Sequence, residues 1–193
     1  MEEALTLGRA EAGAAGIDAP LAVLRIEAGL ALLDLSDPAA PILIREVAME
    51  RAPTKIGYDP GLGGLIVLDE VSAASYALGD LIADGAAAPG AGFPLSDPPG
   101  GALHVAGGVA YLGVGERIEA RDMATGALLG ALDLGRGEIR GLAGQGDLLA
   151  VVAADGAVVA VDLGAGSDMV ARGAAAIGFN QPDQSPVLSG DML

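Results

Sequence analysis

The sequence predicts an all-β protein of the β-propeller type, with about four blades that each contain four antiparallel strands. Two observations predict this fold class: a motif that recurs at a nearly constant spacing, and a hairpin turn at the same offset in three copies of the motif. The copies align without a gap and read AVLRIEAGLALLDLSDP (22–38), AYLGVGERIEARDMATG (110–126) and AVVAADGAVVAVDLGAG (150–166). A period of about 40 residues built of short strands is typical of propellers, in which each repeat forms one blade.

A fourth copy of the motif is expected between the first two. Asp34, Asp122 and Asp162 hold the same place in the three copies, and the interval between the first pair is about twice the interval between the second pair. The expected copy opens near Ile66, in LIVLDEVSAASYALGD (65–80), where Leu78 stands in place of the aspartate. The predicted units cover about 4–50, 51–95, 96–136 and 137–176. Residues 177–193 no longer follow the repeat and are expected to form a C-terminal tail or linker.

Each unit is predicted to centre on one hairpin. In the last unit, Asp155-Gly156 separates two apolar runs, and an Asp-Gly pair in this position is a strong hairpin signal because the tight turn requires positive φ. Gly115-Glu116 and Ala28-Gly29 stand at the same offset in the third and first units. The strands of these hairpins are predicted at Leu21–Ile26 with Leu30–Leu35, Val109–Val114 with Arg117–Met123, and Leu149–Ala154 with Ala157–Leu163.

Weaker apolar runs supply the remaining strands. Those before the hairpins are Thr54–Tyr58, His104–Ala106 and Ile139–Ala143, and those after them are Ile42–Met49, Leu128–Leu134 and Met169–Arg172. Long runs with the helical period are missing, which argues against a helical solenoid. Segment 83–101 is rich in Gly, Pro and Ala and is predicted to be a long loop between the second and third units.

The repeated aspartates have a structural interpretation. Each one ends a strand, where a carboxylate can accept backbone N–H groups of the turn that follows. A ligand-binding role for these aspartates is the alternative. We interpret one set of residues as structural turn residues: Asp34, Asp122, Asp162, Gly126, Gly166, Asp155 and Gly156.

Three segments resemble known propeller repeats. GLALLDLSDPAAPILI (29–44) resembles the LVIVP repeat, whose third strand ends in a D-[VL]-S-[DN]-P turn before a fourth strand led by proline. EARDMATGALLGALDL (119–134) and VAVDLGAGSDMV (159–170) resemble quinoprotein-type repeats. The resemblance implies a ring of about seven or eight blades and a secreted or surface location as part of a longer protein. The chain departs from these families because it has about four units and no tryptophan for interblade contacts.

Composition restricts the partners of the chain. The formal net charge is −16 and Lys55 is the only lysine, so nucleic acid and anionic membranes are poor partners, because binding them requires basic side chains. There is no cysteine, which excludes disulfides and thiolate metal sites. Charges or Gly/Pro interrupt every apolar run short of a membrane span, and the N-terminus does not read as a signal peptide. A complete chain would therefore be cytoplasmic.

The motifs that usually carry chemistry do not assemble. His104 is the only histidine, and no cysteine or second histidine can complete a zinc site with it. Ser185 and Ser189 lie in the tail outside any nucleophile motif, and the two Gly-x-Gly pairs at 113–115 and 135–137 lack the third glycine of a dinucleotide fingerprint. A weak calcium hypothesis rests on loop oxygens from Asp80, Asp84, Ser96 and Asp97. We assign no catalytic, cofactor-binding or metal-binding residue and no cofactor.

The sequence therefore favours a non-catalytic propeller scaffold or protein-interaction domain. The alternatives are a quinoprotein-like or hydrolytic propeller enzyme, and a small-ligand or calcium-binding sensor module. The flanks near Leu21–Leu35 and Leu148–Leu163 are rich in Leu, Val and Ala. We therefore expect the chain to belong to a larger ring, completed by further repeats of the same parent chain or by a second chain.

Overall fold

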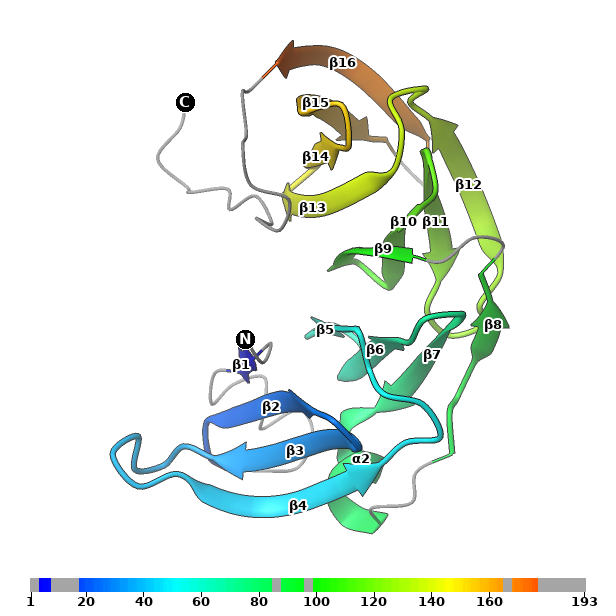
Figure 1. Cartoon of the computed structure of the whole chain (residues 1–193). Helices are drawn as coiled ribbons and strands as arrows, with labels where there is room; N and C mark the ends of the chain where they lie inside the picture. The colour runs from blue at the N-terminus through cyan, green and yellow to red at the C-terminus, as the bar shows by residue number, and fades with distance from the viewer. Residues whose placement is uncertain (1–3, 8–17, 85–87, 96–98, 165–167, 177–193) are drawn as a thin grey trace. The chain divides into compact units, whose positions relative to one another are not determined.

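Four four-stranded antiparallel sheets make up the computed structural model, which describes residues 4–7, 18–84, 88–95, 99–164 and 168–176 (Figure 1). In every sheet the strands pair in chain order, so each sheet is a meander. The first sheet consists of β1 (Ala4–Leu7), β2 (Leu21–Ile26), β3 (Gly29–Asp34) and β4 (Ile42–Ala48). The second consists of β5 (Lys55–Asp59), β6 (Gly64–Leu68), β7 (Ser72–Ala77) and β8 (Gly92–Pro94).

The third and fourth sheets repeat this arrangement. The third consists of β9 (Pro99–Ala106), β10 (Val109–Val114), β11 (Arg117–Asp122) and β12 (Leu128–Asp133). The fourth consists of β13 (Ile139–Gln145), β14 (Leu148–Ala153), β15 (Ala157–Leu163) and β16 (Met169–Ala176). The four meanders confirm the predicted all-β fold of four-stranded antiparallel repeats. The chain divides into two compact units, one with the first and second sheets and one with the third and fourth, and each is described by itself.

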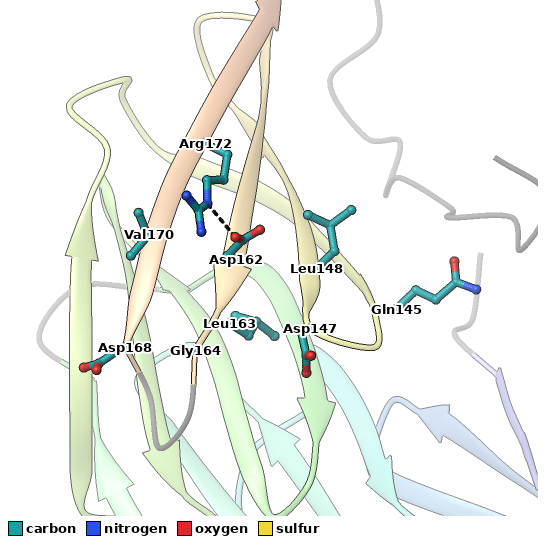
Figure 2. A pocket seen from close by; sticks show the side chains of 9 residues that line it. All are labelled: Gln145, Asp147, Leu148, Asp162, Leu163, Gly164, Asp168, Val170 and Arg172. Carbon is teal, nitrogen blue, oxygen red and sulfur yellow. Dashed lines mark hydrogen bonds and ion pairs between the residues drawn. The ribbon is translucent and has the colours of Figure 1, made fainter. Parts of the chain in front are cut away.

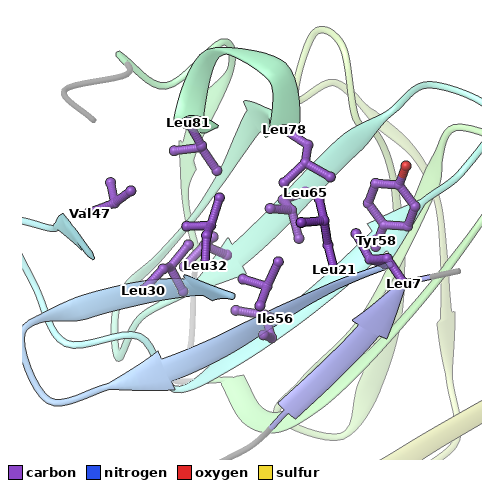
Figure 3. Packing of buried hydrophobic residues seen from close by; sticks show 12 residues of the cluster. Leu7, Leu21, Leu30, Leu32, Val47, Ile56, Tyr58, Leu65, Leu78 and Leu81 are labelled. Atoms are coloured by element: carbon purple, nitrogen blue, oxygen red, sulfur yellow. The ribbon is translucent and has the colours of Figure 1, made fainter. Parts of the chain in front are cut away.

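Apolar side chains from two sheets and a short helix form the core of the first unit (Figure 3). Leu30 and Leu32 of the first sheet and Leu65 of the second are fully buried. Helix α2 (Leu78–Asp84) adds Leu78 and Leu81 to the same cluster. Outside the core, the Arg25 guanidinium Nη1 donates to the carbonyls of Pro53 at 3.1 Å and Thr54 at 2.7 Å, which ties the β2–β3 hairpin to the chain entering β5.

The second unit is packed in the same way. Ile118 of the third sheet and Ile139 and Val151 of the fourth are fully buried in one cluster. At Gly113 on β10, an added Cβ would lie 2.8 Å from both the Ala102 Cβ and the Ile139 Cβ. The Ile139 N–H also donates to the Gly115 carbonyl at 2.8 Å. Glycine therefore allows β13 to approach β10 closely.

The hairpins lie where the sequence predicts them, with two corrections. In the first sheet, Ile26 pairs with Gly29, so the turn is Glu27-Ala28, one residue earlier than predicted. In the fourth sheet, β14 ends at Ala153 and β15 begins at Ala157, so the loop spans 154–156 and is longer than the predicted Asp155-Gly156 pair. A three-residue hairpin needs positive φ at its last residue, and Gly156 has φ 81°.

The second sheet departs most from the prediction. Gly64 pairs with Ala77, as Leu21 pairs with Asp34 in the first sheet, so Ala77 and not Leu78 replaces the repeated aspartate. Leu78 instead begins α2. Segment 83–101 is not one loop, because β8 pairs with β7 as the fourth strand and β9 begins at Pro99. The sequence signal failed here because α2 intervenes between the third and fourth strands and β8 has only three residues. The unit boundaries themselves stay predictions.

Candidate interaction site

Two of the predicted turn aspartates bind the backbone that follows them. The Ser36 N–H donates to Asp34 Oδ1 at 2.7 Å, and the Ala157 N–H donates to Asp155 Oδ1 at 2.9 Å. Hydrogen bonding to Ser36 lowers the pKa of Asp34, and the bond from Ala157 lowers the pKa of Asp155. Asp155 also pairs with Arg136 at 3.0 Å.

The other predicted turn residues have different surroundings. After Asp122, the Gly126 N–H donates to the Asp122 carbonyl at 2.8 Å, and Gly126 has φ 73°. The Asp162 carboxylate accepts from Arg172 Nε at 2.5 Å, across the pair of β15 and β16. Gly166 lies outside the described residues.

Two carboxylates with structural roles, Asp69 and Glu119, were not predicted from the sequence. Asp69, in the β6–β7 turn, accepts the N–H groups of Val71 and Ser72 at 2.7 Å each, and the Ser72 hydroxyl at 2.6 Å. Asp69 is followed three residues later by Ser72, and an aspartate in such a turn sequence can bind the turn backbone. Asp69 does not align with the repeated aspartates, so the repeat pattern does not predict it.

Glu119 is the second missed carboxylate. Its side chain is 2% exposed and lies between Arg117 at 2.7 Å and Arg121 at 2.8 Å. Arg121 also donates to the Gly126 carbonyl at 3.1 Å. The signal was the Arg-x-Glu-x-Arg spacing, because alternate residues of a strand lie on one face. Both guanidinium groups stabilise the buried carboxylate, so this cluster supports β11 and the turn after it.

The candidate chemical residues do not converge on a reactive centre in the described part of the chain. His104 stacks on Tyr111 with ring centroids 6.2 Å apart, and burial lowers its pKa. Asp80 and Asp84 lie on α2 rather than beside a loop, which corrects the geometry of the calcium hypothesis. Ser96, Asp97, Ser185 and Ser189 fall outside the described residues. No group of three or more His, Asp or Glu within the described ranges could hold a metal ion.

The fourth sheet carries a shallow pocket of about 460 Å³ (Figure 2). It lies at the end where β13 turns into β14 and β15 leads to β16. Asp162 and Arg172 lie on one side of it and Leu148 on another (Figure 2). Its lining residues are Gln145, Asp147, Leu148, Asp162, Leu163, Gly164, Asp168, Val170 and Arg172.

The pocket combines an apolar surface with a charged rim. Leu148 is 42% exposed and Val170 is 49% exposed, so both present aliphatic surface to solvent beside the pocket. Asp147 and Asp168 add carboxylates, while Asp162 is already engaged by Arg172. Such a surface can bury an apolar side chain of a partner and exclude water around it. It contains no nucleophile and base within reach of each other among its lining residues.

Sequence comparisons identify no relative: no family profile matches the chain, and no curated protein matches it. Solved structures do match. The computationally designed Ika8 protein matches with TM-score 0.63 and 12% identity over 89% of this chain and 50% of that one. Sqt1 of Chaetomium thermophilum, bound to the N-terminus of ribosomal protein L10, matches with TM-score 0.61 and 18% identity over 79% and 45%. A chain of a mitotic checkpoint complex matches with TM-score 0.62 and 15% identity over 83% and 49%.

These likenesses show the fold. The chain spans half the length of the Ika8 chain. It spans slightly less than half the length of the Sqt1 chain and of the checkpoint-complex chain. No helix in the described part of the chain is long and apolar enough to cross a membrane. The matched structures include WD40-like β-propellers, and the chain shares their architecture of consecutive four-stranded antiparallel blades. The protein therefore has the β-propeller fold.

Proposed function

We propose that the chain is a non-catalytic propeller scaffold that binds a protein through one end of its fourth sheet. This end carries the pocket, where Leu148 and Val170 are exposed, whereas Ala150 and Val152 further along β14 are buried. The observation that carries the proposal is the exposure of Leu148 and Val170 around that pocket. Propeller proteins of similar fold support it, because the Sqt1 structure contains a bound segment of ribosomal protein L10.

The resemblance to LVIVP-type and quinoprotein-like repeats supports a finer proposal. It rests on the D-L-S-D-P turn at 34–38 and the D-M-A-T-G turn at 122–126. Propellers of these families occur often in secreted or surface proteins, so we place the scaffold outside the cell or on its surface, as part of a longer protein. Nothing in the geometry of the described residues favours the alternatives of a propeller enzyme or a calcium-binding sensor.

Site-specific photocrosslinking tests the proposed binding site. A photoreactive phenylalanine analogue replaces Leu148, and a matched protein carries it at Leu62, which is 57% exposed in the β5–β6 turn of the second sheet. In an extract of the source cells, we expect a discrete protein adduct from position 148 and none from position 62. Adducts of the same pattern from both positions, or none from position 148, would contradict the proposed function.

A further inference from the structure

We propose that the pocket on the fourth sheet accepts a lysine or arginine side chain of the protein partner. The inference rests on the proposed function and names the chemistry of the partner at the same site. A basic side chain joins an aliphatic stem to a cationic head, so it can bury the stem on apolar surface while the head meets carboxylates at the rim. The pocket offers both kinds of surface within the fourth sheet alone.

Two exposed aliphatic side chains flank the centre of the pocket. Strand pairing places Leu148 opposite Asp162, and Asp162 opposite Val170. Directly paired residues share one face of a sheet, so these three side chains lie in a row across β14, β15 and β16. Leu148 and Val170 are both exposed. They therefore offer apolar contact to the stem of a basic side chain on either side of Asp162.

The charged residues of the pocket carry an excess of negative charge. Asp147, Asp162 and Asp168 line it together with a single basic residue, Arg172. Because Arg172 pairs with Asp162, the carboxylates of Asp147 and Asp168 remain, and neither forms an ion pair with another residue of the described ranges. Figure 2 shows Asp168 and Val170 on one side of the Asp162–Arg172 pair, and Asp147 and Leu148 on the other. Each side thus combines one aliphatic side chain with one carboxylate.

A basic side chain fits these carboxylates better than a metal ion does. No three acidic or histidine side chains in the described part of the chain lie close enough together to hold a metal, so the aspartates of the pocket do not converge on one point. A guanidinium or ammonium group needs only one or two carboxylates, as Arg172 needs only Asp162. The net charge of −16 favours the approach of basic partners and repels acidic ones.

A titration with two tripeptides tests the preference for a cation. The probes are acetyl-Ala-Arg-Ala-amide and the same peptide with citrulline in place of arginine, which keeps the shape of the side chain and removes its charge. Two-dimensional NMR spectra of the 18.9 kDa chain report which backbone amides respond. We expect saturable shifts centred on 147–148 and 168–172, and about fivefold weaker binding of the citrulline peptide. Equal affinities, or no saturable shift at these residues, would overturn the proposal.

Neutral variants separate the pocket from the general negative charge of the chain. Asp147→Asn combined with Asp168→Asn removes the two carboxylates that Arg172 does not engage and should abolish most of the preference for arginine over citrulline. Glu116→Gln combined with Glu138→Gln is the matched control, because it changes the net charge equally at two exposed positions outside the pocket. The control should keep the preference. Equal losses in both double variants, or no loss in the pocket variant, would overturn the proposal.

Photocrosslinking from position 148 separates this inference from the proposed function. The Asp147→Asn and Asp168→Asn changes are added to the protein that carries the photoreactive residue there, and we expect the yield of the protein adduct to fall by about fivefold. An undiminished adduct would overturn the basic side chain as occupant and leave the scaffold function standing. The absence of any adduct with both aspartates in place would overturn the proposed function, whereas the preference for arginine is measured without a partner.

Discussion

Aspartate carboxylates hold the turns of this chain, but the repeated positions do not use them alike. Asp34 and Asp155 each bind one backbone N–H two residues later, whereas Asp162 binds Arg172 across a strand pair. Asp69, which accepts three hydrogen bonds in the β6–β7 turn, is outside the repeat pattern. At this scale, the sequence identified residue types suited to turns, and the local geometry decided which donor each carboxylate meets.

Replacing Asp69 with alanine should destabilise the protein more than replacing Asp34. Asp69 is partly buried and accepts three hydrogen bonds from Val71 and Ser72, so Asp69→Ala should lower the unfolding free energy by about 1 kcal/mol or more. In its turn, Asp34 is bonded to Ser36 alone, and water can replace that exposed bonding. Urea unfolding midpoints measure the difference. Asp69→Asn keeps an acceptor and should recover part of the loss; equal midpoints for both alanine variants would contradict this view.

His104 should make stability decrease as the pH falls through 6.5, the ordinary pKa of histidine. Burial lowers its pKa below the ordinary value of 6.5, so the unfolded chain binds a proton more readily than the folded one. Above about pH 7 the imidazole is neutral in both states and contributes no pH dependence. As pH falls below 6.5, protonation favours the unfolded state and stability decreases.

The matched variant for this prediction is His104→Gln, which removes the only histidine of the chain. Unfolding free energies of both proteins are measured across the same pH range, so that contributions of the carboxylates cancel in the comparison. We expect a steeper loss of stability for the native sequence. Parallel curves would show that His104 does not titrate differently on folding.

At the scale of elements, close approach between strands depends on one glycine. Gly113→Ala places a methyl group 2.8 Å from Ile139 and Ala102, and β13 must move to relieve the contact. We expect a loss of about 1–3 kcal/mol in unfolding free energy, the usual effect of overpacking a tight core. Gly173→Ala on β16 is the control, because nothing lies within 4 Å of its added Cβ. Thermal unfolding should separate the two variants, and similar melting temperatures would argue against a tight β10–β13 contact.

The elements differ in how far their own residues and adjacent turns predict them. β2, β10 and β15 begin and end at the predicted residues because alternation and adjacent turns mark both ends of each strand. β8 has three residues and a Gly/Pro-rich neighbourhood, so only its pairing with β7 defines it as a strand. Helix α2 has only seven residues, and its leucines are explained by the core they enter rather than by a helical repeat in the sequence.

At the scale of the whole molecule, charge restricts what the chain can bind. With a net charge of −16 and a single lysine, it should not bind DNA, RNA or anionic vesicles at physiological salt. Fluorescence anisotropy with labelled oligonucleotides and co-sedimentation with phosphatidylserine vesicles measure this. A dissociation constant below about 1 µM that rises steeply with salt would contradict the prediction.

The sequence by itself determined the class of fold, because strand alternation, turn residues and the repeat are local patterns that survive without knowledge of distant contacts. It also indicated Asp34 and Asp155 as turn residues. Only the tertiary structure decided that Gly113 faces Ile139, that Glu119 is buried between two arginines, and that Leu148 and Val170 border a pocket. These features depend on which sheet faces pack together. The sequence of a strand does not show whether the face that carries an apolar residue is covered or exposed.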